Sequence, residues 1–190
     1  MEKAEMIRRL AQELPEKRYH HVVAVSETAV QLARHYGVDE HKAEIAGLLH
    51  DCARKIPTKE YVEKAAELGI AIDAIEKAQP ILIHAKLGAY LAKTEFGVTD
   101  PEILESIRYH TTGAAHMTPL DQVIYLADLV EPHRDFAGVE QLRKDVLISL
   151  PYGMEQALIH TMHYLLGQGS LIHPDCLSGY NELVLRQKNS

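Results

Sequence analysis

The sequence lacks the features that define several large protein classes. Only two of its 190 residues are cysteines, Cys52 and Cys176, and neither lies in a CxxC spacing. A disulfide framework is therefore not expected, and packing is the favoured role of both thiols. No apolar run approaches the roughly 20 residues that span a bilayer. The N-terminus MEKAEMIRRLAQEL is charged and has no signal-peptide apolar core, so we expect a cytoplasmic protein without a membrane partner.

Basic runs, glycine-rich loops and linkers are also missing. The formal net charge is −7 and lysines and arginines are scattered, which argues against nucleic acid as the partner but leaves a small phosphate ligand open. No Walker-type glycine loop is present, so a P-loop nucleotidase is not indicated. No Gly/Ser-rich linker or internal repeat divides the chain. What stands out instead is the presence of 12 histidines.

The hydrophobic periodicity is helical nearly throughout, and no alternating segment is long enough to indicate a strand. One apolar stripe ends at Pro15, and a second, over 22–36, is closed by Gly37. Asp39 and Thr58 are expected to cap the next two helices. A cap followed by proline predicts further helix starts at Asp100, Thr118 and His173. The sequence therefore predicts an all-α fold of about eight to ten helices.

The stretch GLLHDCARKI places His50 and Asp51 directly after two leucines. Burying such a polar pair costs several kcal/mol, by roughly the transfer free energies of such groups, unless partners satisfy it. A single HD dipeptide is expected by chance, so on its own it indicates a histidine bonded to backbone and an exposed aspartate. Its meaning depends on the rest of the chain.

Four more polar residues lie on or beside apolar helical faces. They are His21 before the helix over 22–36, His84 in ILIHAKLGAYLA, His110 at the end of ILESIRYH, and Asp128 in VIYLADLVEP. Each alone could be a satisfied core residue, but six such residues on five helices favour one shared metal centre. Histidine and carboxylate without thiolate suit Fe(II), Mn(II), Co(II) or Zn(II). Six ligands suit two ions, with the second oxygen of Asp51 available to bridge them.

The ordered set H…HD…H…H…D resembles the HD-domain superfamily of metal-dependent phosphohydrolases. A closer resemblance runs along almost the whole chain. The stretches RYHHVVAVSETAVQLA, AGLLHDCARKIP, ILIHAKLGA, IRYHTTG, LADLVEPHRDF and LIHPDCLSGYNEL are similar to the YqeK family of small bacterial HD proteins. We expect an N-terminal helix at 1–15, an HD domain at 16–135, and a C-terminal helical extension at 136–190 packed on the same domain.

The resemblance also implies an activity, the symmetrical cleavage of diadenosine tetraphosphate to two molecules of ADP. The cofactor that it implies is iron, and we expect one or two ions, with Mn, Co or Zn as possible substitutes. It places the principal metal on His21, His50, Asp51 and Asp128, with Asp51 acting together with a metal-bound hydroxide. It places a second metal, or substrate phosphate, on His84 and His110. His21 also faces the substrate.

Cationic residues beside these ligands are candidates for binding phosphates, because arginine grips two oxygens at once. Arg18, Arg54 and Arg134 follow or precede a ligand at short spacing, and Lys55 is a further cationic candidate beside Arg54. Thr111 follows His110 and offers a hydroxyl to the same phosphates. By resemblance alone, His173 and Tyr180 contact the base or the far phosphate.

Two alternatives stay open from the sequence. The chain could be another HD phosphohydrolase, acting on nucleoside di- or triphosphates, cyclic nucleotides or alarmones, since metal ligands read phosphate and not the nucleoside. It could also be a non-catalytic nucleotide sensor. A homodimer is suggested only by how common two-fold oligomers are.

Overall fold

The computed structural model describes residues 1–189, which form eleven α-helices and three 3₁₀ segments without a strand, as the all-α prediction expected. The number of helices exceeds the predicted eight to ten because the chain contains three additional short helices, α4, α5 and α9. The elements are α1 (Lys3–Glu13), α2 (Glu16–Tyr36), α3 (Glu40–Leu49), η1 (Cys52–Lys55), η2 (Thr58–Glu60), α4 (Tyr61–Glu67), α5 (Ala74–Ala78), η3 (Pro80–Leu82), α6 (Ile83–Thr94), α7 (Pro101–Tyr109), α8 (Pro119–Val130), α9 (Val139–Asp145), α10 (Leu150–Gly167) and α11 (Pro174–Lys188).

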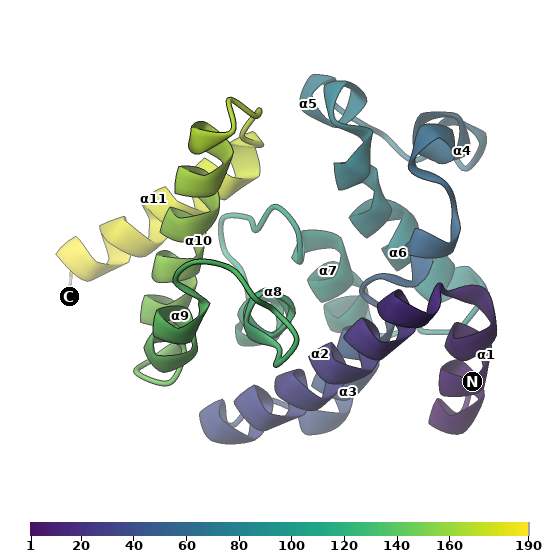
Figure 1. Ribbon diagram of the computed structural model, residues 1–190, viewed down its shortest axis with the longest axis horizontal. Coiled ribbons are helices and arrows are strands. Elements are labelled where there is room, and N and C mark those ends of the chain that lie inside the picture. Colours follow the sequence, from purple (N-terminus) through teal and green to yellow (C-terminus); the bar gives the residue numbers. More distant parts are fainter. Residues whose placement is uncertain (190) are drawn as a thin grey trace.

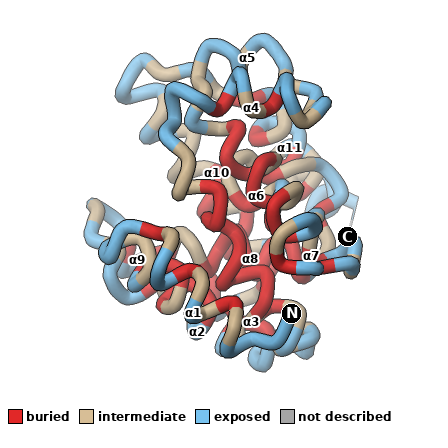
Figure 2. The backbone as a smooth tube through the Cα atoms, turned by 90° about the vertical axis from the view of Figure 1, so that its right-hand side faces the viewer, coloured by how far each residue is buried: buried red, intermediate tan, exposed pale blue. Residues whose placement is uncertain are grey.

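Helix α8 is the centre of the bundle. Helices α2, α3, α7 and α10 pack against it, and α11 packs against α10 (Figure 1). The sequence of α8, PLDQVIYLADLV, is apolar on nearly every side, as is expected of a helix enclosed by others. Burial is concentrated along α8, α6 and α3, whereas α5 and α9 are mostly exposed or half-buried (Figure 2). Within residues 1–189, no helix has the length and apolarity needed to cross a membrane.

Most predicted helix ends are confirmed. The side chains of Asp39, Asp100 and Thr118 each accept a hydrogen bond from a backbone N–H in the first turn of their helix, and His173 caps α11 through its ring. Gly37 ends α2 with a φ of 68°, a conformation that glycine adopts without strain. Local capping chemistry therefore sets these boundaries.

Three local predictions were wrong. Helix α2 begins at Glu16, directly after Pro15, so His21 lies in its second turn and not at its start. Thr58 caps no α-helix, because its segment turns as the 3₁₀ helix η2 before α4 begins. Helix α3 ends at Leu49, so His50 and Asp51 lie at a helix junction and not inside an apolar helix.

Helices α2 and α3 approach each other closely at Gly47. A Cβ atom built on Gly47 would lie 2.7 Å from the Cα of Ser26. The Ser26 hydroxyl donates a 2.9 Å hydrogen bond to the carbonyl of Glu44 at the same crossing. This contact holds the end of α3, and with it His50 and Asp51, against α2.

We predict that Gly47→Ala lowers the free energy of unfolding by about 1–3 kcal/mol, because the added methyl group forces the two backbones apart. Gly167→Ala is the matched control, since a Cβ there meets no atom within 4 Å. The measurement is thermal or urea unfolding followed by circular dichroism. Equal stability of the two variants would contradict the close-packing account.

Candidate metal centre

Six buried or half-buried side chains from five parts of the fold converge at one place. Five of the six are buried, and Asp128 is half-buried. They come from the second turn of α2, the α3–η1 junction, the first turn of α6, the end of α7 and the last turn of α8, and are His21, His50, Asp51, His84, His110 and Asp128. We call this set the six-residue cluster. Its members are the residues that the sequence predicts as metal ligands.

The histidine rings are held by their Nδ1 atoms. Nδ1 of His50 lies 2.7 Å from the carbonyl of Gly47, and Nδ1 of His110 lies 2.6 Å from the carbonyl of Ile107. His84 bonds the carbonyl of Ile81 in the same way. A carbonyl only accepts, so each Nδ1 carries the proton and each Nε2 presents a lone pair. Local backbone geometry at helix ends thus fixes the tautomer that binds metals.

The two oxygens of Asp51 face two sides of the cluster. Oδ2 lies 3.9 Å from Nε2 of His21 and 3.7 Å from Nε2 of His50. Oδ1 lies 3.2 Å from Nε2 of His84 and 3.9 Å from Nε2 of His110. Asp128 belongs to the first side, with its Oδ1 3.0 Å from His21 and 3.7 Å from His50. One carboxylate therefore joins the His21/His50 side to the His84/His110 side.

Hydrogen bonds within the protein do not satisfy all of the imidazole Nε2 atoms. Nε2 of His21 and Nε2 of His50 are buried without a hydrogen-bond partner, although His21 lies close to Asp128. Nε2 of His84 and Nε2 of His110 face each other at 3.0 Å. The Thr111 hydroxyl, 3.2 and 3.0 Å from these nitrogens, has one proton and can serve only one of them. Buried lone pairs that converge in this way fit a divalent cation, and groups drawn from the cluster lie within 4.8 Å of one another.

Charges in the cluster are set by burial and by mutual contact. Burial alone would raise the pKa of Asp51 and of Asp128, but the neighbouring histidines, and Arg134 for Asp128, hold both pKa values well below the usual range. Burial lowers the pKa of His50, and burial with the neighbouring His50 and His84 lowers that of His110 to about 3. At neutral pH the carboxylates are ionised and these two imidazoles are neutral, which are the forms that bind metal.

Three arginines border the cluster. Nη1 of Arg18 lies 2.7 Å from Oδ2 of Asp51, and Nε of Arg54 lies 3.9 Å from Oδ1 of the same carboxylate. The guanidinium of Arg134 bonds both the side chain and the backbone carbonyl of Asp128. The structure thus brings the predicted arginines, and Thr111, to the cluster.

Three other predicted contacts are engaged elsewhere. The ammonium of Lys55 pairs with Glu13 and Glu95, at 2.7 Å each. His173 bonds Asp73 at 2.7 Å and caps α11, while Tyr180 packs against the hydrophobic core. These contacts give all three residues structural roles, and their roles in binding substrate stay predictions.

A cleft of about 1070 Å³ opens beside the His21/His50 side. Arg18, His21, Arg54 and Arg134 are among its walls. Several further residues that line the cleft were not predicted as site residues from the sequence, namely His20, Thr58, Tyr61, Glu131, His133 and Phe136. Glu131 follows Asp128 by three residues, just past the end of α8. This spacing was the signal in the sequence that could have identified Glu131 as a residue of the site.

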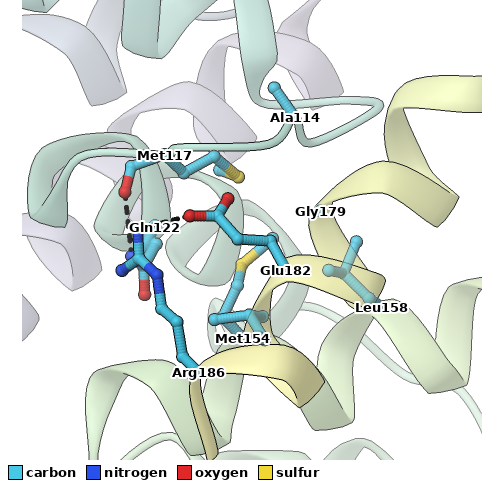
Figure 3. A pocket seen from close by; sticks show the side chains of 9 residues that line it. Ala114, Met117, Gln122, Met154, Leu158, Gly179, Glu182 and Arg186 are labelled. Atoms are coloured by element: carbon cyan, nitrogen blue, oxygen red, sulfur yellow. Dashed lines mark hydrogen bonds and ion pairs between the residues drawn. The ribbon is translucent and has the colours of Figure 1, made fainter. Parts of the chain in front are cut away.

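Two other places in the fold bring polar side chains together. A pocket of about 10 Å³ lies between α8, α10 and α11, where Met117, Gln122, Glu182 and Arg186 point toward one another (Figure 3). It has room for about one water molecule. Asp73, Glu76 and His173 also lie close together, but the Glu76 carboxylate is already bonded to Lys86 and to the Asp73 backbone. The six-residue cluster is therefore the candidate site.

Fold and cluster together define a helical protein with a buried His/Asp centre able to hold divalent metal. The HD domain family model matches residues 18–132, which contain all six residues, and the chain belongs to this family. It is 40% identical to the "Bis(5'-nucleosyl)-tetraphosphatase, symmetrical" of Bacillus subtilis over 97% of this chain and 98% of that protein. The protein of the same name from Halalkalibacterium halodurans is also 40% identical, over 92% and 93% of the two chains.

A solved structure has the same fold. It is described as a "predicted HD superfamily hydrolase involved in NAD metabolism" from Clostridium acetobutylicum. The TM-score is 0.94 with 35% sequence identity, and the match covers 98% of each chain. The likeness therefore extends through the C-terminal helices as well as the region matched by the family model.

We predict that Asp51→Ala lowers bound Mn²⁺ more than His84→Ala does, because Asp51 faces both sides of the cluster and His84 only one. Asp73→Ala, at the other group of acidic and histidine side chains, is expected to keep full metal content. The measurement is metal stoichiometry by mass spectrometry after equilibrium dialysis. Unchanged stoichiometry in Asp51→Ala, or a loss in Asp73→Ala, would place the metal elsewhere.

Proposed function

We propose that the chain hydrolyses diadenosine tetraphosphate symmetrically, with water, to two molecules of ADP. The observation that carries the proposal is the convergence of four buried imidazole Nε2 atoms on the two oxygens of Asp51, beside a cleft bordered by three arginines. Two of these nitrogens, those of His21 and His50, have no hydrogen-bond partner. The sequence supports it through two relatives named symmetrical bis(5'-nucleosyl)-tetraphosphatases, which match the chain over more than nine-tenths of its length.

The cluster would hold the cofactor through its two sides. His21, His50, Asp51 and Asp128 would bind the principal ion, and His84 and His110 a second ion or a phosphate. When bound, a divalent cation supplies Lewis acidity and a nucleophile at neutral pH. We propose Fe(II) as the native ion, which is what the resemblance to the YqeK family implies. Mn, Co or Zn are possible substitutes, because imidazole and carboxylate ligands without thiolate suit all four metals.

The chain's own residues position the polyphosphate. Arg18, Arg54 and Arg134 would bind the non-bridging oxygens and neutralise charge that develops during phosphoryl transfer. Thr111 offers a hydroxyl on the His84/His110 side. Leaving groups of the ADP type are already good, so positioning and electrostatics supply most of the catalysis. We place the reaction in the cytoplasm, with a free nucleotide and not a nucleic acid as substrate.

A second candidate substrate is a nucleotide of NAD metabolism. The observation that favours it is the description of the Clostridium acetobutylicum structure as a hydrolase involved in NAD metabolism, since that structure matches nearly the whole chain. The cluster would contact phosphate groups, which both candidate substrates contain, so it does not distinguish between them. Both substrates should therefore be assayed in one panel, without oxygen and with added Fe(II) or Mn²⁺.

We predict that the metal-loaded protein releases ADP as the sole nucleotide product of diadenosine tetraphosphate, and that Asp51→Ala abolishes this turnover. Chromatographic separation of the products decides the outcome. AMP together with ATP would contradict symmetrical cleavage. Turnover of NAD-related nucleotides alone would favour the second candidate, and turnover of neither would favour a nucleotide sensor.

We predict that Arg54→Ala lowers kcat/KM about 10- to 100-fold, the loss that corresponds to one charge-assisted hydrogen bond of about 1.5–3 kcal/mol. Arg54 is chosen because it borders the cluster without a close bond to a carboxylate there. Arg8→Ala is the matched control, since Arg8 is exposed on α1 and pairs only locally with Glu5. Steady-state kinetics at saturating metal provide the measurement. Equal kcat/KM in both variants would remove Arg54 from the substrate site.

A further inference from the structure

Glu131 is a buried carboxylate that directly follows α8, three residues after Asp128. Its side chain is 2% exposed, and burial of an ionised group is costly unless it is paired and hydrogen-bonded. Nε of Arg134 lies 3.9 Å from Oε1 of Glu131, which is too long for a close ion pair. The position of Glu131 therefore needs a reason beyond a local ion pair.

The first oxygen of Glu131 holds the ring of His21. Oε1 lies 3.1 Å from Nδ1 of His21. Because an ionised carboxylate only accepts, Nδ1 donates to Glu131. Nε2 lies 3.0 Å from Oδ1 of Asp128 but makes no hydrogen bond, so it is the nitrogen available to a metal. Glu131 lies on the opposite side of the ring from the cluster, so it acts on a ligand and is not one itself.

His21 needs this partner because of its place in the fold. His50 and His110 directly follow a helix, and His84 lies in the first turn of α6, where the carbonyl three residues earlier is free to accept from Nδ1. His21 lies inside the long helix α2, where carbonyls are already used by the helix. A side chain from another element must replace the missing backbone acceptor, and Glu131 supplies it.

The second oxygen of Glu131 organises the segment that follows. Oε2 accepts the backbone N–H of His133 at 2.6 Å and lies 3.1 Å from its Nδ1. The backbone of the same segment is held by Arg143 of α9, which donates to the carbonyls of Glu131 and Arg134 at 2.8 and 2.9 Å. Glu131 thus connects a predicted metal ligand with the turn that carries Arg134.

We propose that Glu131 is a positioning residue that fixes the tautomer and orientation of His21 for the metal and couples this ligand to the 131–134 turn. Carboxylates that orient metal-binding histidines change metal affinity by about 10- to 100-fold when they are removed. The inference rests on the metal centre of the proposed function, but not on the identity of the substrate.

The test compares Mn²⁺ affinity, measured without substrate, in Glu131→Ala, Glu131→Gln and Glu182→Gln of the full chain. Paramagnetic resonance of free Mn²⁺ gives the dissociation constant. We expect about 10- to 100-fold weaker binding in Glu131→Ala. Glu131→Gln should lie between it and the unmodified protein, because the amide oxygen still accepts from Nδ1. Glu182→Gln is the control, since Glu182 is also largely buried but bonds His116 and Arg186.

Two results would overturn the proposal. One is Mn²⁺ affinity in both Glu131 variants within twofold of the control. The other is an unchanged ratio of His21 tautomers in metal-free Glu131→Ala, measured by nitrogen-15 NMR of the ring. If Glu131→Ala fails to fold, Glu131→Gln decides alone: unchanged affinity overturns the proposal and a several-fold loss supports it. If the unmodified protein does not hydrolyse diadenosine tetraphosphate but the Glu131 variants bind Mn²⁺ more weakly, the proposed activity is refuted and the proposed role of Glu131 is supported.

Discussion

The site depends on one constraint, the fixing of imidazole Nδ1 atoms by acceptors that lie outside the cluster. Three rings use a backbone carbonyl three residues earlier, and His21 uses Glu131. Each bond turns an Nε2 lone pair inward, toward the oxygens of Asp51 and Asp128. Without these bonds the rings could rotate or change tautomer, and the same residues would be ordinary buried histidines.

The fold can be understood as the means of bringing these anchored rings together. Central α8 carries Asp128 and is followed directly by Glu131, while α2, α3 and α7, which supply His21, the His50–Asp51 pair and His110, pack around it. The close approach of α2 and α3 at Gly47 brings His50 and Asp51 toward His21. Packing of α6 against η1 and α7 adds His84 from the remaining direction. The side chains of Arg18, Arg54 and Arg134 border the cluster on the side where the cleft opens.

Much of this was available from sequence, for physical reasons that differ between features. Caps such as Asp39, Asp100 and Thr118 act within one helical turn, so local sequence sets them. The six cluster residues were predicted as a set because each is a polar residue on an otherwise apolar helical face. The partners of Lys55 and His173, and the role of Glu131, depend on residues 40 to 110 positions away. No periodicity reports such contacts, and the place of His50 and Asp51 at a helix junction was missed because the apolar pattern continues up to it.

The central claim is that Asp51 joins two sides of one metal centre. Anomalous diffraction from crystals of the Mn²⁺-loaded protein tests it most directly, because it locates metal independently of any assay of turnover. The account predicts metal bounded by His21, His50 and Asp128 at one oxygen of Asp51, with any second ion between His84 and His110 at the other oxygen. An anomalous peak at Asp73, Glu76 and His173, or one that leaves Asp51 without contact to metal, would contradict it.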